Sequence, residues 1–499
     1  MDEMKEMGTP VQEMRFEKSM QPELSTEVVL PDYRSEISRL LWVRPTVLPP
    51  VCFKGNAGTD VSGKICYHIL YAGPDGKLYS AEAEDAYDVT LPLAEGESQQ
   101  FSVVVEPHTV VGRAVAPRRL QLRCRLQIKA CGYEEKEWEE LLSPDVSDAA
   151  CLLGGNVCGA EFFSSVGEAV EVNDTFPAPA EEGEIVTAWG EVLLGEAVAG
   201  VDSARLRGEA SVCVLWQAGE GEDCRPKVLT RRIPCAFEVP MADVSTEDKL
   251  RAWATVCEVC AVNEAGSISV AVRLVPVIEG QREREIYYVK DLFLQGFDTK
   301  CHCNTQKIWQ AKACANRNFS VSHTAEHVAG LPAGAEILCA WAEAELAPDG
   351  EKSALRGELH CHMLYRKGTE FGVSDVALPT RLDMAGVTPQ SSAVCRVPLC
   401  HARAEGSGVR VDAEVAVALR TVEEIEVRPV AQVEAVPSAS PYSLDVELCY
   451  PGKGETLWEV AKRYGVAPCE IAAANGVPLS LPADEVLVGE KPCLFVPVR

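Results

Sequence analysis

The chain has 499 residues, of which 47% are hydrophobic, and its formal net charge is −28 at pH 7. This length corresponds to about three or four domains of ordinary size. No apolar run approaches the roughly 18 residues that a membrane-spanning helix needs, so we expect a soluble protein. The negative charge argues against binding to nucleic acid or anionic lipid, because Lys and Arg are what recognise both. We expect protein or neutral glycan partners instead.

The N-terminal sequence, MDEMKEMGTPVQEMRFEKSMQPE, is polar and charged and has no apolar stretch typical of a secretory signal. Residues 1–20 are therefore expected to be a polar tail, and the protein is expected to stay in the cytosol. There the 21 cysteines are kept reduced, and most are interpreted as small buried hydrophobes.

One motif occurs three times along the chain. In each copy an apolar residue and a proline precede a Glu-Ile pair, and a tryptophan follows. The apolar-Pro pairs are Leu30-Pro31, Phe176-Pro177 and Leu331-Pro332, and the later parts are Glu36-Ile37 with Trp42, Glu184-Ile185 with Trp189, and Glu336-Ile337 with Trp341. The first copy has one extra residue before its tryptophan. This recurrence indicates three repeats.

A second recurrence follows each tryptophan, at a spacing of 145 to 149 residues. The segments are GKICYHILY at 63–71, GEASVCVLW at 208–216 and GELHCHMLY at 357–365. Alternate positions are apolar in all three copies, which predicts a strand with one buried face. These positions are Ile65/Ala210/Leu359, Tyr67/Val212/Cys361, Ile69/Val214/Met363 and Tyr71/Trp216/Tyr365.

Each repeat is predicted to end in a long amphipathic strand. The alternating apolar residues are Leu120, Leu122, Cys124, Leu126 and Ile128, then Ile268, Val270, Val272 and Leu274, then Val409, Val411, Ala413, Val415 and Val417. Strands separated by Gly, Pro, Asp and Asn favour antiparallel sandwiches or open barrels of about 110 to 150 residues. The expected repeats are 21–172, 173–318 and 319–436. The first two carry long connections at 138–172 and 286–320, which the third lacks.

In the last fifty residues the spacing of apolar residues changes from the alternation of strands to the period of helices. The sequence VRPVAQVEAVPSASPYS leads into a linker expected at 437–446, which is followed by a small domain at 447–499. Leu457, Val460, Ala461 and Tyr464 lie on one face of a predicted helix that Thr456 caps. A second helix is predicted at 468–475, with Asn-Gly at its exit, and a strand at 494–496. The expected fold is mainly β, with three tandem repeats followed by a small βααβ domain.

This last domain resembles a LysM module. The motif residues are Gly454-Glu455-Thr456-Leu457-Trp458, Ala461-Lys462-Arg463-Tyr464-Gly465-Val466, Ala474-Asn475-Gly476, Gly489 and Val496-Pro497. LysM modules commonly bind the N-acetylglucosamine backbone of peptidoglycan or chitin in a shallow groove between two loops. By position, the resemblance assigns to this groove Gly454, Glu455, Thr456, Leu457, Trp458, Asn475, Gly476, Val477, Pro478 and Leu479. The family usually has Asp where Glu455 stands, and the stretches from Asn475 to Gly489 and from Gly489 to Leu494 are longer here.

The three repeats resemble SPOCS domains of sporulation proteins, and the whole arrangement resembles the SipL type of spore coat morphogenetic factor. The resemblance implies a non-enzymatic scaffold that is made in the mother cell and localises around the forespore. Its LysM module is expected to dock on the morphogenetic ATPase that polymerises into the coat basement layer, and its repeats on other coat proteins. The alternative is a peptidoglycan-binding protein of the spore cortex or cell wall. A third possibility is self-assembly of the repeats through their edge strands.

Residue types suited to catalysis or metal binding are scattered along the chain. A zinc site could be formed by Cys257 and Cys260 together with Cys301-His302-Cys303, because thiolate and imidazole groups are the usual zinc ligands. However, Cys257 and Cys260 are three residues apart in a predicted strand and would point to opposite faces. We therefore favour thiols that are buried or have no ligand role. His360 and His362 share one strand face, where packing or solvation is the expected role. No nucleophile elbow or phosphate-binding loop is present, so neither an enzyme nor a cofactor is expected.

Two residue-level questions remain in the predicted LysM module. Trp458 is interpreted either as a ligand-stacking residue or as part of the domain core, and its place in the apolar stripe favours the core. Glu459 and Lys462 are expected on the exposed face of the same helix. A further hypothesis is that cysteines cross-link the assembled coat after the mother cell lyses.

Overall fold

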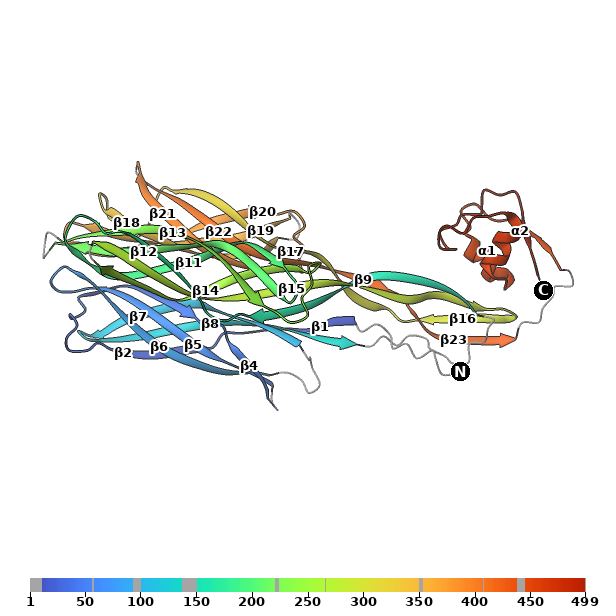
Figure 1. The fold of residues 1–499 in the computed structure, drawn as a ribbon, viewed down its shortest axis with the longest axis horizontal. Coiled ribbons are helices and arrows are strands. Elements are labelled where there is room, and N and C mark those ends of the chain that lie inside the picture. Colours follow the sequence, from blue (N-terminus) through green and yellow to red (C-terminus); the bar gives the residue numbers. More distant parts are fainter. Residues whose placement is uncertain are drawn as a thin grey trace.

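The computed structural model describes residues 11–55, 58–92, 100–136, 150–219, 224–264, 266–349, 353–406, 408–437 and 445–498. Strands make up most of this part of the chain, and the two helices described lie near the C-terminus. The predicted mainly β fold is therefore confirmed. The three repeats lie side by side, and a narrower extension leads from them towards the small C-terminal domain (Figure 1).

Each repeat contains two antiparallel sheets that enclose its core. In repeat 1 the sheets are β3 (Arg39–Val47), β5 (Gly58–Ala72) and β6 (Leu78–Leu91), and β2 (Glu23–Val29), β8 (Arg119–Lys136) and β7 (Gln100–Ala116); β1 (Val11–Met20) and β4 (Val51–Gly55) extend them. In repeat 2 they are β11 (Gly183–Ala199), β12 (Ser203–Ala218) and β13 (Arg225–Pro240), and β10 (Val170–Pro177), β15 (Ser267–Leu294) and β14 (Lys249–Glu264). In repeat 3 they are β18 (Glu336–Asp349), β19 (Ala354–Lys367) and β20 (Glu370–Asp383), and β17 (Gln306–Ala325), β22 (Gly408–Val427) and β21 (Ser392–Glu405).

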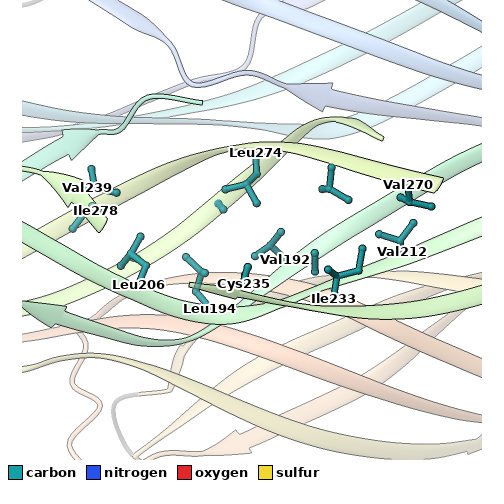
Figure 2. Packing of buried hydrophobic residues seen from close by; sticks show 14 of the residues in the cluster. Val192, Leu194, Leu206, Val212, Ile233, Cys235, Val239, Val270, Leu274 and Ile278 are labelled. Carbon is teal, nitrogen blue, oxygen red and sulfur yellow. The ribbon is translucent and has the colours of Figure 1, made fainter. Parts of the chain in front are cut away.

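The predicted apolar faces form the repeat cores. All twelve side chains of the recurring strand are buried, from Ile65 at 0% exposure to Tyr365 at 7%. The alternating residues of the three closing strands are buried as well. Figure 2 shows the two sheets of repeat 2 meeting over Val192, Val212, Ile233 and Leu274. Each fully buried aliphatic side chain stabilises the folded chain by about 1.5 to 3 kcal/mol, so this alternation is the main source of the fold's stability.

Strands cross the expected repeat boundaries. Residues 172 and 173 both lie in β10, and residues 318 and 319 both lie in β17. Residues 11–20, expected in a polar tail, form β1, which pairs with β8. Alternation in sequence marks where a strand passes through a core, but its ends depend on which distant strand it pairs with.

The long connections, together with the segment that follows repeat 3, form an extension that we call the arm. It consists of residues 150–158 of β9 (Ala150–Val166), residues 285–294 of β15, and the pair of β16 (Phe297–Cys303) and β23 (Val430–Pro437). β9 pairs with residues 277–294 of β15. These residues follow the alternating residues 268–274 of β15 that close repeat 2. The arm runs from the sandwiches towards the C-terminal domain (Figure 1).

The three tryptophans meet where the repeats pack together. The ring centroid of Trp42 lies 5.1 Å from that of Trp189 and 4.8 Å from that of Trp341. Leu70, Leu215 and Leu364, which occupy equivalent positions, complete this cluster. The recurring tryptophan motif therefore joins the repeats to one another.

Strand register corrects how the first tryptophan aligns with the others. Each repeat has a bulge in the tryptophan-bearing strand, at Leu41, Val186 and Leu338. Trp189 lies three residues after its bulge and Trp341 lies three after its own, but Trp42 directly follows Leu41. Relative to the bulge of its strand, Trp42 therefore lies two residues earlier than Trp189 and Trp341 do. Because residues two apart in a strand point to the same side, its ring still reaches the shared cluster.

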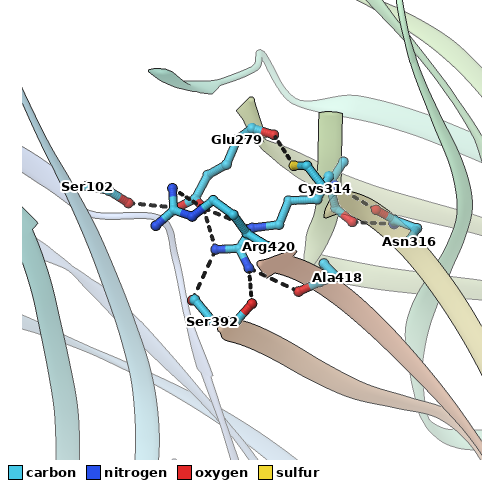
Figure 3. Close-up of polar contacts among 9 residues, drawn as sticks. Ser102, Glu279, Cys314, Asn316, Ser392, Ala418 and Arg420 are labelled. Carbon is cyan, nitrogen blue, oxygen red and sulfur yellow. Dashed lines mark hydrogen bonds and ion pairs between the residues drawn. The ribbon is translucent and has the colours of Figure 1, made fainter. Parts of the chain in front are cut away.

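A buried ionic cluster also joins all three repeats (Figure 3). The Glu279 carboxylate in repeat 2 accepts a hydrogen bond from Arg251 Nε at 2.9 Å and one from Ser102 Oγ of repeat 1 at 2.7 Å. Arg420 of repeat 3 lies 3.5 Å away from the same carboxylate. Arg251 in turn donates to the Ser392 Oγ of repeat 3 at 3.2 Å. These contacts distribute one buried negative charge between two guanidinium groups.

The electrostatics of the cluster follow from this geometry. Burial acts to raise the pKa of Glu279, but Arg251 and Arg420 outweigh it and lower the pKa to about 2. The carboxylate is therefore ionised throughout the neutral range. Loss of the Glu279 charge would leave two buried guanidinium groups without this counter-charge, which is costly.

Candidate functional site

The C-terminal module, residues 445–498, has the predicted βααβ order. It consists of β24 (Glu447–Cys449), α1 (Leu457–Tyr464), α2 (Pro468–Asn475) and β25 (Leu494–Val496), with β24 and β25 antiparallel. Leu457, Val460 and Ala461 are fully buried, as the predicted helical face requires. The two helices and the short sheet enclose a small core of their own.

A capping box begins α1. The Thr456 hydroxyl accepts a hydrogen bond from the Glu459 N–H at 3.3 Å, and the Thr456 N–H donates to the Glu459 carboxylate at 2.8 Å. The predicted cap is thus confirmed, and Glu459 has a structural role on the exposed side of the helix. Gly465 and Gly476 end the two helices with positive φ angles of 62° and 60°, which favour glycine.

The first predicted groove loop is held together by Glu455. Its carboxylate accepts a hydrogen bond from the Gly452 N–H at 2.8 Å and pairs with Arg463 of α1. Leu457 points into the core, whereas Gly454 is exposed at the turn. The glutamate found in place of the usual aspartate therefore closes the loop, and backbone at Gly454 is what this loop presents to solvent.

The second predicted groove loop is anchored by Asn475. Its Oδ1 accepts a hydrogen bond from the Phe495 N–H at 2.8 Å, and its Nδ2 donates to the Phe495 carbonyl at 2.7 Å. Val477 packs partly against the core, while Gly476, Pro478 and Leu479 are exposed. The Asn475 side chain thus ties α2 to β25, and the accessible apolar surface lies just after it.

Trp458 lies in the interior, as the core interpretation predicted. The side chain is 5% exposed and packs with Val460 and Leu494. Its ring centroid is 5.2 Å from that of Phe293, which belongs to the arm. A ligand stacking on this indole would therefore have to displace the arm.

The arm holds the module through Asp291, a residue for which the sequence offered no signal. The Asp291 carboxylate accepts hydrogen bonds from Trp458 Nε1 at 2.9 Å and from Lys462 Nζ at 2.6 and 2.7 Å. Lys462, expected on an exposed face, is therefore engaged by the arm. Lys290 adds an ion pair with Asp484 at 2.5 Å. We call these contacts the dock.

The contacts of the dock favour the ionised form of Asp291. Partial burial acts to raise the pKa of Asp291, but hydrogen bonds from Lys462 and Trp458 lower it below its ordinary value. The side chains of Asp291 and Lys462 remain 26% and 35% exposed, so solvent screens their attraction. The dock is therefore a polar contact, partly exposed to solvent, that surrounds the aromatic pair of Phe293 and Trp458.

Several large apolar side chains of the module face solvent and were not singled out from the sequence. Leu481 and Leu487 lie in the long loop between α2 and β25, and Tyr450 follows β24. Leu448 and Phe495 are exposed cross-strand partners in the small sheet. With Leu479, they make six large apolar side chains of the module that are exposed to solvent.

The other candidate ligands occupy separate environments. The Cys257 thiol donates to the Thr255 carbonyl at 3.6 Å, and Cys260 is exposed. His362 stacks on Trp341 and lies 2.6 Å from an Asp375 carboxylate oxygen. Within the described ranges, no group of three His, Cys, Asp or Glu side chains could hold a metal ion. Nor does that part of the chain contain a helix with the length and apolarity needed to cross a membrane.

Comparison with protein families finds a LysM domain at residues 452–490. No curated protein and no solved structure matches the chain. A LysM domain indicates a module for binding peptidoglycan or another glycan, or for binding protein. The resemblance of the three repeats to SPOCS domains stays a prediction.

Proposed function

We propose that the chain is a non-enzymatic scaffold of endospore envelope assembly. Its repeats hold coat proteins, and its LysM module docks on the morphogenetic ATPase of the coat basement layer. In this proposal the protein is made in the mother cell cytosol and gathers at the forespore surface. Several weak sites on one chain raise the overall affinity through effective concentration.

The observation that carries this proposal is how the module is presented. Asp291 and Phe293 hold it through α1, while Gly454, Pro478 and Leu479 of the two predicted groove loops are exposed. A module held on an arm through one face, with its loops open, suits a scaffold that presents a docking unit.

The chemistry of the open side supports a protein partner. Leu479, Leu481 and Leu487 are exposed leucines of one loop, and exposed apolar side chains of this size are available to pack against a protein partner. Asn475, a polar side chain at the predicted groove, is used up in bonds to Phe495. Fewer polar side chains are thus available there for sugar hydroxyl groups.

Peptidoglycan binding is the second candidate. The LysM match itself favours it, because glycan binding is the common activity of such modules. In this alternative the backbone at Gly454 and Gly476 would contact the glycan, and the protein would act at the cortex or cell wall.

A capture experiment from sporulating cells separates these functions. The baits are the intact chain, a version truncated after Ser440, and the variants Leu479→Asp and Leu481→Asp. Val201→Asp is the matched control, because Val201 is an exposed apolar residue of repeat 2. Bound proteins are identified by mass spectrometry, and each bait is also sedimented with purified peptidoglycan.

The scaffold proposal expects the ATPase with the intact chain and with Val201→Asp, and its loss with the truncation and with both loop variants. If no bait captures the ATPase while the intact chain sediments with peptidoglycan, the glycan function replaces it. Capture by the truncated chain would assign the contact to the repeats instead.

A further inference from the structure

Two buried cysteines face each other across the core of repeat 3. Cys361 lies on β19 in one sheet and Cys400 on β21 in the other, and their Sγ atoms are 3.8 Å apart. Their exposed fractions are 0% and 7%. Both belong to the cluster that packs the two sheets together. Two thiols in contact across a sandwich are poised for a bond that would join the sheets covalently.

The pair is particular to repeat 3. Strand register places Val212 of repeat 2 at the position of Cys361 and Val259 at that of Cys400, because Val259 lies opposite Val272 as Cys400 lies opposite Ala413. Valine fills both positions in repeat 2, so packing alone does not require sulfur there.

A cavity borders Cys400, one of the two cysteines. A space of about 1480 Å³ lies between the repeats, and Cys400 lines it together with Trp341 and Arg396. Charged and polar side chains line this space alongside apolar ones, so water and small polar solutes can enter it. An oxidant of a few atoms can thus approach Cys400 without separation of the sheets.

We propose that Cys361 and Cys400 form an inter-sheet disulfide when the chain meets a small peroxide. The Cys400 sulfur, as thiolate, attacks one oxygen of hydrogen peroxide and breaks the O–O bond, which gives a sulfenic acid and hydroxide. The hydroxide takes up the proton that the thiol released and becomes the first water. The Cys361 sulfur then displaces the hydroxyl group, which leaves as a second water. Overall two thiols and one peroxide yield one disulfide and two waters, and the sulfurs lose the two electrons that the peroxide gains.

The environment sets the rate of this reaction. The contact with Cys361 and burial both raise the pKa of the Cys400 thiol, so little thiolate is present at neutral pH. Oxidation is therefore slower than at exposed thiols such as Cys469 and Cys303, and it accelerates as the pH rises. The same burial protects the finished bond from reductants.

The test exposes the full-length chain to hydrogen peroxide, alkylates the remaining thiols in denaturant and digests the protein without reductant. We expect a linked peptide pair containing Cys361 and Cys400, which dithiothreitol separates. The oxidised chain should also melt roughly 4 °C or more higher, because the bond closes a loop of 39 residues between strands of facing sheets.

Variants that copy the residues of repeat 2 keep the test independent of folding. Cys361→Val and Cys400→Val place valine where repeat 2 has it, and both should fold yet show neither the linked pair nor the rise in melting temperature. Cys235→Val, which removes a buried thiol of repeat 2, should keep both. The proposal is overturned if the linked pair is absent from the oxidised chain, if Cys400 links to Cys339 instead, or if the rise persists in Cys361→Val.

Discussion

The junction between the repeats and the dock of the C-terminal module both use an acidic side chain with basic partners, yet they differ in solvent exposure. Glu279 is 3% exposed at its side chain and contacts groups from all three repeats. Asp291 is 26% exposed and contacts one helix. A buried ion pair is insulated from salt, whereas a half-exposed one is screened. We therefore expect the repeats to behave as one body and the module to be releasable.

The largest effect is expected from breaking the buried cluster. Glu279→Gln leaves Arg251 and Arg420 without their counter-charge in the interior, which should lower the free energy of unfolding by about 3 to 5 kcal/mol. Chemical denaturation monitored by circular dichroism measures it. Glu283→Gln is the matched control, since Glu283 pairs with Lys249 at the surface and should cost less than about 1 kcal/mol. Equal losses in the two variants would contradict the expected difference between buried and exposed pairs.

Acid titration sharpens the same comparison. The pKa of Glu279 is about 2 in the folded chain and near 4.5 in a solvated one, so its stabilisation is complete above about pH 4.5 and is lost as the pH falls towards 2. The shift corresponds to about 3 kcal/mol. The difference in unfolding free energy between the parent chain and Glu279→Gln should shrink over this range. A difference that stays constant from pH 6 to pH 3 would show that the charge of Glu279 does not matter.

An intermediate effect is expected at the dock. Asp291→Asn removes the charge that Lys462 contacts and should weaken the dock by about 1 to 2 kcal/mol, without lowering the melting temperature of the repeats. Released Trp458 should become accessible to acrylamide, measured as fluorescence quenching against the parent chain. High salt should produce part of the same change in the parent chain. Glu434→Gln, an exposed arm carboxylate near Lys300, should leave the quenching unchanged.

The smallest effect is expected within the module itself. Thr456→Ala removes one half of the capping box and should destabilise the module by about 1 kcal/mol, while the dock and the repeats keep their stability. Hydrogen exchange at the amides of α1 measures this local loss. Ser480→Ala, in the exposed loop, serves as the control. Faster exchange in β12 or β15 would mean that the module and the repeats unfold together.

Half of the candidate site could be predicted from sequence. The LysM motif predicted the two groove loops, and the predicted cap at Thr456 is confirmed. Which groove side chains face solvent did not follow. Asn475 and Glu455 look available in sequence, but contacts with Phe495 and Arg463 turn them inwards. These contacts depend on segments that meet only in the folded module.

The sequence by itself determined the strand faces and the order of elements. Alternation in 63–71, 208–216 and 357–365 identified buried side chains correctly, because a strand's two faces follow directly from its period of two residues. Tertiary structure alone decided where strands end, how Trp42 reaches the other tryptophans, and how Asp291 meets Lys462 from 171 residues away. The physical reason is that local periodicity records which side of a strand is apolar, whereas pairing between distant segments is chosen by packing and charge in the assembled chain.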